Sequence, residues 1–289
     1  MILKGPWRNT RKGREDMADN SSLKKRVASS VLILTLAGLV TFYFPNWIFT
    51  LLASAMIGCA LWEFFGLAEK KGIFVYKYFG ILIGMLVPII MYFQMGIEGY
   101  VTTEPFFIVI ACLFTFVLLF TRRENSQALA SIAVTMFGLL YIAWFFSFFV
   151  KLKFLPQGSL LVAFLIIVTK MGDVGAYFIG KAFGKHSLIP RISPNKTVEG
   201  TIGGLVFSVG SALAGKFYLP SFSLGHLLTL GLLLGILAQV GDLAESLIKR
   251  DCNVKDASSN ISGFGGMLDI MDSLIFTVPI FYFYVKVLV

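Results

Sequence analysis

Charged residues and cysteines are both scarce in this sequence. Charged side chains make up 14% of the 289 residues, whereas hydrophobic side chains make up 57%. A soluble domain of this length cannot bury so much apolar surface, so the composition excludes a soluble globular protein. The three cysteines, Cys59, Cys112 and Cys252, have neither the spacing nor the surroundings of a disulfide framework or a zinc site.

Long apolar runs are abundant, and they are continuous rather than alternating in polarity. Runs of about 18 residues or more suit membrane-spanning helices, whereas the strands of a membrane barrel alternate. The sequence therefore predicts an all-α, polytopic integral membrane protein with about nine transmembrane helices. These spans are expected at residues 27–44, 47–67, 79–96, 105–121, 128–150, 159–180, 201–219, 227–248 and 270–288.

Basic residues are distributed unevenly between the predicted spans. Residues 1–26 carry eight Lys and Arg residues, which predicts a basic cytoplasmic tail on the lipid surface rather than a cleavable signal. With this N-terminus inside, nine spans leave most other basic residues on the cytoplasmic side and place the C-terminus outside. Lys151 and Lys153 go against this bias. Topology explains the net charge of +9, and no nucleic-acid partner is expected.

Acidic residues gather in the second half of the chain, where half of the 16 lie between residues 170 and 272. We expect residues 27–150 to form an N-terminal transmembrane scaffold and residues 151–289 to form a catalytic transmembrane domain. An acidic side chain at span depth costs ~2.5–3.5 kcal/mol, so each such residue is a functional candidate. Asp173 is one, although a hydrogen-bonded Asp between helices packed through glycines would also explain it.

The segment LIPRISPNKTVEGTIGG, residues 188–204, predicts an exposed turn followed by the start of a helix. The free N–H groups of that helix, with Lys196 beside them, would form a phosphate cradle. The GxxxxGK[ST] order of the common nucleotide-binding loop is absent. An ordinary helix start, with basic residues facing lipid headgroups, is the alternative.

A second polar segment, GDLAESLIKRDCNVKDAS, coincides with the end of a predicted span. Four of its side chains share one helical face at the spacing i, i+3, i+4 and i+7, namely Asp242, Glu245, Ser246 and Lys249. Such a face must look into protein or water rather than into lipid. The polar surface continues into the following loop through Arg250, Lys255 and Asp256.

Two carboxylates three residues apart, Asp269 and Asp272, stand at the cytoplasmic entrance of the last span in the stretch GFGGMLDIMD. Acidic residues in a first helical turn can simply complement the helix dipole. The glycines just upstream, however, allow a ligand to approach the backbone closely, which that explanation does not require. They are Gly263, Gly265 and Gly266.

These carboxylates, lysines and glycines all fall on the cytoplasmic side of the predicted topology, so they can converge on one site. Hard carboxylate oxygens without nearby His or Cys suit Mg²⁺ bound together with substrate phosphates. Lys and Arg around the metal would bind the remaining phosphates. A metal and phosphate site at this face predicts an enzyme at which a cytosolic nucleotide meets a lipid.

The segment SLIKRDCNVKDASSNISGFGGMLDIMD, from Ser246 to Asp272, resembles the signature of the phosphatidate cytidylyltransferases, also called CDP-diacylglycerol synthases. That signature reads Ser, two residues, Lys-Arg, four residues, Lys-Asp, a glycine-rich turn with His-Gly-Gly, and finally Asp-Arg-x-Asp. The segments DVGAYFIGKAFGK, ISPNKTVEGTIGG and GDLAES are similar to the family as well, so the resemblance covers residues 165–289. The chain departs from the pattern where Phe264 replaces His, Ile270 replaces Arg and Ser262 replaces Pro.

The resemblance implies transfer of a cytidylyl group from CTP to phosphatidate, which gives CDP-diacylglycerol and pyrophosphate. It implies an enzyme of the bacterial cytoplasmic (inner) membrane whose active site faces the cytoplasm, and a homodimer. The implied cofactors are Mg²⁺ and a second, monovalent cation such as K⁺. Asp242 and Asp269 would be the metal ligands, supported by Asp256 and Asp272.

Further roles follow from the same resemblance. The catalytic residues would be Asp242, Asp269, Lys249 and Lys255. The phosphates would be bound by Lys196, Lys249, Arg250 and Lys255. The nucleotide pocket would be shaped by Ser193, Thr197, Glu199 and Gly200. The substrate-binding set is completed by Ser246, Gly265, Gly266 and Asp173, of which Asp173 would orient one of the lysines.

Two other functions stay open on the sequence. One is cytidylyl or phosphoryl transfer to a different lipid phosphate or a polyprenol, which the replacements at Phe264 and Ile270 favour. The other is an ion-coupled membrane transporter, in which Asp173, Asp242 and Glu245 would line an ion path. A path needs polar residues through the whole bilayer depth, whereas these gather at the inner end. The paired DGxxAR and GxxxD motifs of the CDP-alcohol phosphatidyltransferases are not found.

Overall fold

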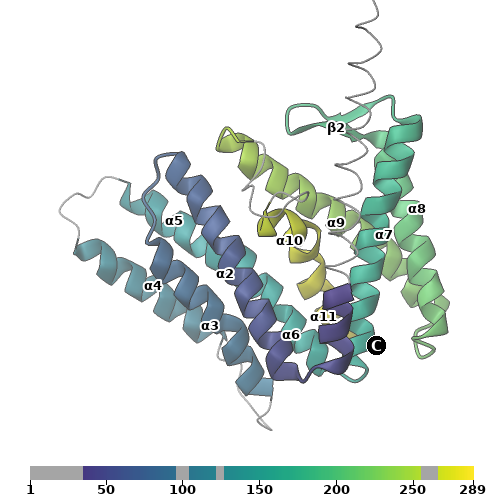
Figure 1. Ribbon diagram of the computed structural model, residues 1–289, viewed down its shortest axis with the longest axis horizontal. Coiled ribbons are helices and arrows are strands. Elements are labelled where there is room, and N and C mark those ends of the chain that lie inside the picture. The colour runs from purple at the N-terminus through teal and green to yellow at the C-terminus, as the bar shows by residue number, and fades with distance from the viewer. Residues whose placement is uncertain (1–34, 96–103, 122–126, 255–265) are drawn as a thin grey trace, which may run out of the picture.

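The computed structural model describes residues 35–95, 104–121, 127–254 and 266–289, and nearly all of them are helical (Figure 1). Residues 35–43 are α-helical and precede α2. The long helices that follow are α2 (Asn46–Lys70), α3 (Lys77–Met95), α4 (Glu104–Phe120), α7 (Gly158–Phe183), α8 (Val198–Ala214) and α9 (Leu224–Asp251). Between α4 and α7 lie α5 (Ala128–Gly138), a π-helical segment η1 (Leu139–Trp144) and α6 (Phe145–Phe154), and a short 3-10 turn η2 (Gly215–Phe217) follows α8.

Seven helical segments in the described part of the chain are long and apolar enough to cross a membrane. They begin and end within a few residues of seven of the predicted spans, because each apolar run is closed by polar or turn-forming residues. The helix at Phe106–Phe120 is apolar but shorter, and of the span predicted at residues 27–44 the part from residue 35 onward is described. The all-α, polytopic prediction is therefore confirmed.

The last span is not one straight helix. It consists of α10 (Met267–Ile275) and α11 (Thr277–Leu288), which are separated at Phe276. The hydroxyl of Thr277 donates to the carbonyl oxygens of Ser273 (3.1 Å) and Leu274 (3.0 Å) across this junction. These hydrogen bonds tie the start of α11 to the last turn of α10.

A small β-hairpin joins α7 to α8, where the sequence predicted an exposed turn. Its strands, β1 (Ser187–Ile189) and β2 (Ser193–Thr197), pair antiparallel, and Figure 1 shows them projecting beyond the ends of α7 and α8. The hairpin contains the only β-strands among the described residues. Helix α8 begins directly after it at Val198, as the sequence predicted, with Thr197 as the N-cap.

Helices α7 and α8 pack closely through glycines. A Cβ added to Gly172 would lie 2.4 Å from the hydroxyl oxygen of Ser208, and one added to Gly175 would lie 2.5 Å from the ring of Phe207. From the other side, a Cβ on Gly203 would lie 2.4 Å from Ile179. The glycines near Asp173 thus pack helices, as the alternative explanation of that segment proposed, and this close packing fixes one wall of the site.

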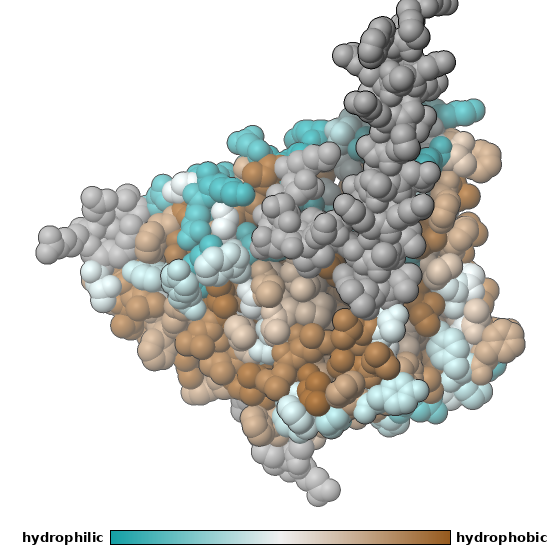
Figure 2. Space-filling view, viewed as in Figure 1, coloured by the Kyte–Doolittle hydropathy of each residue, from teal (hydrophilic) through white to brown (hydrophobic). Residues whose placement is uncertain are grey.

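The division of the chain at residue 150 does not coincide with a break in structure, because α6 continues from Phe145 to Phe154. Residues of the two halves also contact each other directly. The ammonium group of Lys71, after α2, pairs with the carboxylate of Asp251 at the end of α9. Figure 2 shows apolar residues across the middle of one face, with hydrophilic residues gathered mainly along its upper border.

Candidate active site

A cavity of about 660 Å³ lies at the end of the molecule that carries the hairpin. Its walls come from α7, both strands of the hairpin, the first turn of α8, the second half of α9 and α10. Seven residues predicted from the sequence line it, namely Asp173, Lys196, Thr197, Gly200, Asp242, Asp269 and Asp272. The structure therefore brings together segments that are far apart in the sequence, as the prediction of a convergent site required.

The hairpin and α9 meet at an ion pair on the cavity wall. The Nζ atom of Lys196 lies 2.6 Å from Oδ2 of Asp242, and about a third of each side chain is exposed. Gly200, one turn into α8, donates its N–H to the hydroxyl of Thr197 at 3.1 Å. A lysine ammonium and a capped helix N-terminus thus face the same space, an arrangement that favours binding of an anionic group.

Glu199 is adjacent to the cavity lining but is directed toward the base of the hairpin. Its carboxylate accepts hydrogen bonds from the backbone N–H groups of Lys185 (3.1 Å) and His186 (3.3 Å). Its Oε1 atom also lies 2.6 Å from Nδ1 of His186. In this structure Glu199 holds the two ends of the hairpin together, so it acts on the pocket through the hairpin.

Three carboxylates converge where α9 meets α10. One oxygen from each of Asp242, Glu245 and Asp272 lies within 4.8 Å of the other two. Glu245 has no exposed side-chain surface and Asp272 is almost fully buried. Buried negative charges this close together repel unless a cation balances them. Three hard oxygen donors with no sulfur or imidazole among them fit Mg²⁺.

Lys249 links the same two helices. Its Nζ atom lies 2.5 Å from Oε2 of Glu245 and 2.5 Å from Oδ1 of Asp269. The second carboxylate oxygen of Asp269 accepts the backbone N–H of Gly266 at 2.6 Å. Both oxygens of Asp269 are thus engaged with protein groups, and the described carboxylate cluster contains Asp272 and Glu245 in the place that the sequence analysis gave to Asp269.

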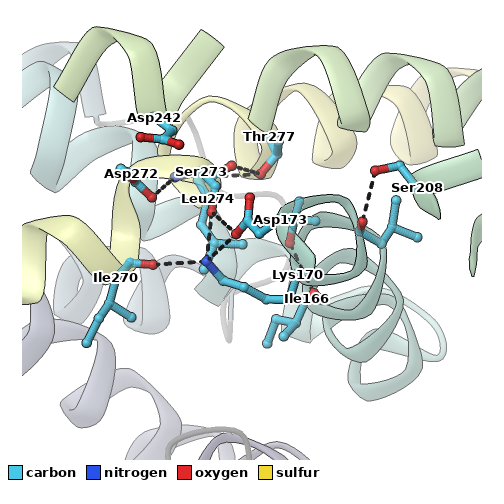
Figure 3. Close-up of polar contacts among 12 residues, drawn as sticks. Ile166, Lys170, Asp173, Ser208, Asp242, Ile270, Asp272, Ser273, Leu274 and Thr277 are labelled. Carbon is cyan, nitrogen blue, oxygen red and sulfur yellow. Dashed lines mark hydrogen bonds and ion pairs between the residues drawn. The ribbon is translucent and has the colours of Figure 1, made fainter. Parts of the chain in front are cut away.

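Lys170 was not among the predicted site residues, yet it lines the cavity, and Figure 3 shows its polar contacts. Its Nζ atom lies 3.0 Å from Oδ2 of Asp173, 2.8 Å from the hydroxyl of Ser273 and 3.5 Å from the carbonyl oxygen of Ile270. Asp173 therefore does contact a lysine, one turn away on its own helix. A lysine inside an apolar run was the signal that could have identified it.

Glu63 is a second residue that the sequence analysis missed. It belongs to α2, is 6% exposed, and accepts hydrogen bonds from the N–H groups of Met267 (3.0 Å) and Leu268 (2.9 Å). These N–H groups begin α10 and have no partner within that helix. A Cβ on Gly266 would lie 2.2 Å from Oε2 of Glu63, so a side chain at this position would displace the Glu63 carboxylate. The N-terminal half thus holds the helix that carries Asp269 and Asp272.

The remaining predicted residues lie away from the cavity or outside the described residues. Arg250 is exposed and donates to the carbonyl oxygens of Ile192 (3.2 Å) and Val254 (3.3 Å), which ties the hairpin to the end of α9. Ser193 and Ser246 are half-buried and do not line the cavity. The predictions that fall outside the described residues concern Lys255, Asp256 and Gly265.

Comparison with known sequences assigns the family. The profile of the Cytidylyltransferase family matches residues 24–288, which is most of the chain. The chain belongs to this family. The resemblance inferred from residues 246–272 is thereby confirmed, and it extends into the N-terminal half, where the motifs gave no signal.

Individual members of the family align over nearly the full length. The phosphatidate cytidylyltransferase of Bacillus subtilis is 32% identical over 269 residues, which cover 90% of this chain and 97% of the relative. The phosphatidate cytidylyltransferase of Synechocystis is 30% identical over 293 aligned residues, with 91% and 97% covered. An uncharacterised Escherichia coli protein, YnbB, is 40% identical over 159 residues, but that match spans about half of each chain.

Proposed function

We propose that the protein transfers a cytidylyl group from CTP to phosphatidate and so forms CDP-diacylglycerol and pyrophosphate. The observation that carries this proposal is the cavity in which Lys196 and the N-terminus of α8 face Asp242, Asp269 and Asp272. Lysines and carboxylates in one cavity, together with apolar lining residues, suit a phosphate-rich nucleotide and a lipid acceptor. The names of the two full-length relatives support the same substrates.

We place the protein in the bacterial cytoplasmic membrane with nine spans, a cytoplasmic N-terminus and the cavity facing the cytoplasm. Seven apolar helices and the bacterial relatives support this placement. The segments 27–44 and 105–121 would supply the other two spans. With this orientation the hairpin, the end of α9 and the start of α10 border the cytosol, where CTP is available. A homodimer stays a prediction from the family.

The carboxylates of Asp242, Glu245 and Asp272 would hold Mg²⁺, and Asp256 and Asp269 are the further ligands predicted from the signature. Bound Mg²⁺ neutralises phosphate charge and orients the nucleotide. A second, monovalent cation such as K⁺ would be held nearby. Glu245 has no exposed side-chain surface, so its oxygen would reach the ion from the buried side of the site, whereas Asp242 and Asp272 line the cavity.

The residues of the chain would carry out positioning rather than proton transfer. Lys196 and the N–H groups of α8 would bind the phosphates of CTP, with Thr197 and Gly200 setting the shape of that wall. The phosphate of phosphatidate is already ionised near neutral pH. One of its oxygens attacks the α-phosphorus of CTP, the bond from that phosphorus to the β-phosphate oxygen breaks, and pyrophosphate leaves. Charge neutralisation and in-line placement are the main requirements of such a transfer.

A different lipid acceptor is the second candidate, because Ile270 lines the cavity where the family signature has arginine. That replacement removes a cation from the wall that an acceptor would contact. The acceptor would then be another lipid phosphate, such as a polyprenyl phosphate. An ion-coupled transporter is less well supported, since the carboxylates and lysines of the cavity cluster near one end of the described helices.

The test is product formation by purified protein in mixed micelles. Labelled CTP and Mg²⁺ would be supplied with phosphatidate in one reaction and with polyprenyl phosphate in another. We expect labelled CDP-diacylglycerol from the first reaction, and its loss in the Asp242→Asn variant. Absence of a lipid product with phosphatidate, together with product from polyprenyl phosphate, would transfer the assignment to the second candidate.

A further inference from the structure

Lys170 is a cation placed where cations are costly. It lies within the apolar helix α7, 11 residues before Lys181 at the end of that helix, which corresponds to a depth of about 16 Å. A lysine at span depth costs on the order of 2.5 kcal/mol or more by insertion scales, unless protein groups or water compensate for it. Its ammonium group is nevertheless at the cavity wall rather than at the membrane border.

The position of Lys170 differs from that of Lys196 in what surrounds it. Lys196 belongs to the hairpin, where the neighbouring Asn195 is exposed and polar. Lys170 shares one face of α7 with Val174 and Tyr177, which also line the cavity and are 40% and 51% exposed. Lys170 therefore belongs to the part of the cavity that lies deep along the apolar helix α7, whereas Lys196 belongs to the hairpin beyond the helix ends.

Lys170 also lies beside the residue at which this chain departs from the family signature. The signature has arginine at the position of Ile270, on α10. The Nζ atom of Lys170 lies 3.5 Å from the carbonyl oxygen of Ile270, and both residues line the same cavity (Figure 3). The cation absent from α10 is therefore matched by a cation that reaches the same wall from α7.

We propose that Lys170 binds the phosphate of the lipid acceptor, in the place that the signature gives to an arginine at residue 270. This inference rests on the proposed function, since it names the residue that holds the second substrate. Asp173 and Ser273 hold the ammonium group in position through contacts of 3.0 and 2.8 Å. The ammonium group has three N–H donors, and a phosphate oxygen would replace the longest of its three contacts, that of 3.5 Å to the carbonyl oxygen of Ile270. Because the other two contacts already fix the group, it loses little further freedom on binding.

The test compares Lys170→Met with Lys170→Arg and with the double variant Lys170→Met/Ile270→Arg. Loss of the ammonium group is expected to raise the KM for phosphatidate about 10- to 100-fold, the size of one lost charged hydrogen bond. The KM for CTP should change less than about twofold, because Lys196 is untouched. The Arg variant and the double variant should each recover most of the affinity for phosphatidate. Lys185→Met, which removes an exposed lysine outside the cavity, is the matched control.

A binding measurement separates this inference from the proposed function. Binding of a short-chain phosphatidate to the purified wild-type and Lys170→Met proteins requires no turnover, so it is informative even if no CDP-diacylglycerol forms. Weaker binding by Lys170→Met that Ile270→Arg restores supports the assignment. An unchanged Kd in Lys170→Met overturns it, as does an equal loss of affinity for CTP, which would mean that Lys170 only balances the charge of Asp173.

Discussion

Asp269 and Asp272 lie three residues apart on α10, yet their carboxylates have different partners. Asp269 pairs with Lys249 and accepts the N–H of Gly266, whereas Asp272 joins Asp242 and Glu245. The sequence analysis had assigned metal binding first to Asp269 and a supporting role to Asp272. We propose the reverse emphasis, because both oxygens of Asp269 are engaged with protein groups, and two matched variants can test it.

Asp272→Asn should raise the Mg²⁺ concentration needed for half-maximal activity about 10- to 100-fold, because one of three convergent carboxylates is lost. Asp269→Asn should instead lower the temperature of unfolding, because Lys249 loses one of its two carboxylates. Activity measured against Mg²⁺ concentration, with thermal unfolding of both proteins, distinguishes the two effects. A larger change in Mg²⁺ requirement for Asp269→Asn would favour the assignment made from the sequence.

Much of the site could be predicted from single residues, and the reason is energetic. Carboxylates inside apolar runs are energetically expensive, so Asp173 and Asp242 stood out from their neighbours. Lys170 and Glu63 have the same property and were passed over, because neither belongs to a recognisable motif. The partners of Glu199 and Arg250 could not be predicted, since they depend on a hairpin that places residues 185–192 beside the helix ends.

At the scale of elements, α10 is a short helix whose position depends on its contacts with α2 and α9. Glu63 accepts two N–H groups at its start, and Gly241 of α9 lies against its middle. The signature motifs describe α10 itself, whereas its support comes from a residue more than 200 positions earlier in the sequence. Local sequence predicts that α10 is a helix, but long-range contacts determine where it lies.

Glu63→Ala should lower the free energy of unfolding by about 1.5–3 kcal/mol, because it removes a charged acceptor from two buried N–H groups. It should also reduce activity, since Asp269 and Asp272 move with α10. Glu69→Ala is the matched control on the same helix, because Glu69 pairs with Lys77 at 3.1 Å in a partly exposed position. Equal unfolding temperatures for the two variants would show that Glu63 does not hold α10.

Gly241→Ala should destabilise the protein, although in the sequence Gly241 is only one small residue among many. A Cβ there would lie 2.2 Å from the carbonyl oxygen of Asp272, so α9 and α10 would have to separate at a cost of about 1–3 kcal/mol. Gly210→Ala is the control, because no atom lies within 4 Å of a Cβ at that site. It should stabilise α8 by up to about 1 kcal/mol. Thermal unfolding in detergent compares the two, and similar melting curves would contradict this packing.

At the scale of the whole molecule, composition alone determined the class of protein. Apolar runs predicted helices because no other open structure satisfies backbone hydrogen bonds in lipid. The order and approximate limits of seven spans followed, but the break at Phe276 and the hairpin did not. Pro279 was the signal for the break, because a proline ring clashes with the carbonyl group four residues earlier, here that of Ile275, where α10 ends. Strands of three and five residues are too short to show a clear alternating pattern.

The proposed orientation predicts which residues are accessible from each side of the membrane. Lys185 and Ser221 are exposed near opposite ends of α8. Single cysteines at these two positions, in a background without the three natural cysteines, should react with an impermeant thiol reagent from different sides. In sealed, right-side-out vesicles we expect Ser221→Cys to be labelled and Lys185→Cys to be protected until the vesicles are opened. The opposite pattern would place the cavity outside and contradict a site supplied with cytosolic CTP.

Under the proposed function the cavity has a kinetic consequence, because its lining combines Val174 and Tyr177 of the apolar helix α7 with Lys181 and Asn195 near the hairpin. The lipid substrate would reach the cavity by two-dimensional diffusion in the bilayer, and the nucleotide would reach it by three-dimensional diffusion in water. The occupancy of the cavity by the lipid substrate would then depend on the mole fraction of that lipid in the bilayer. Diluting phosphatidate with an inert lipid would slow the reaction even when the total amount of phosphatidate in the sample is unchanged. The rate of the reaction would therefore depend on the lipid composition of the membrane around the enzyme.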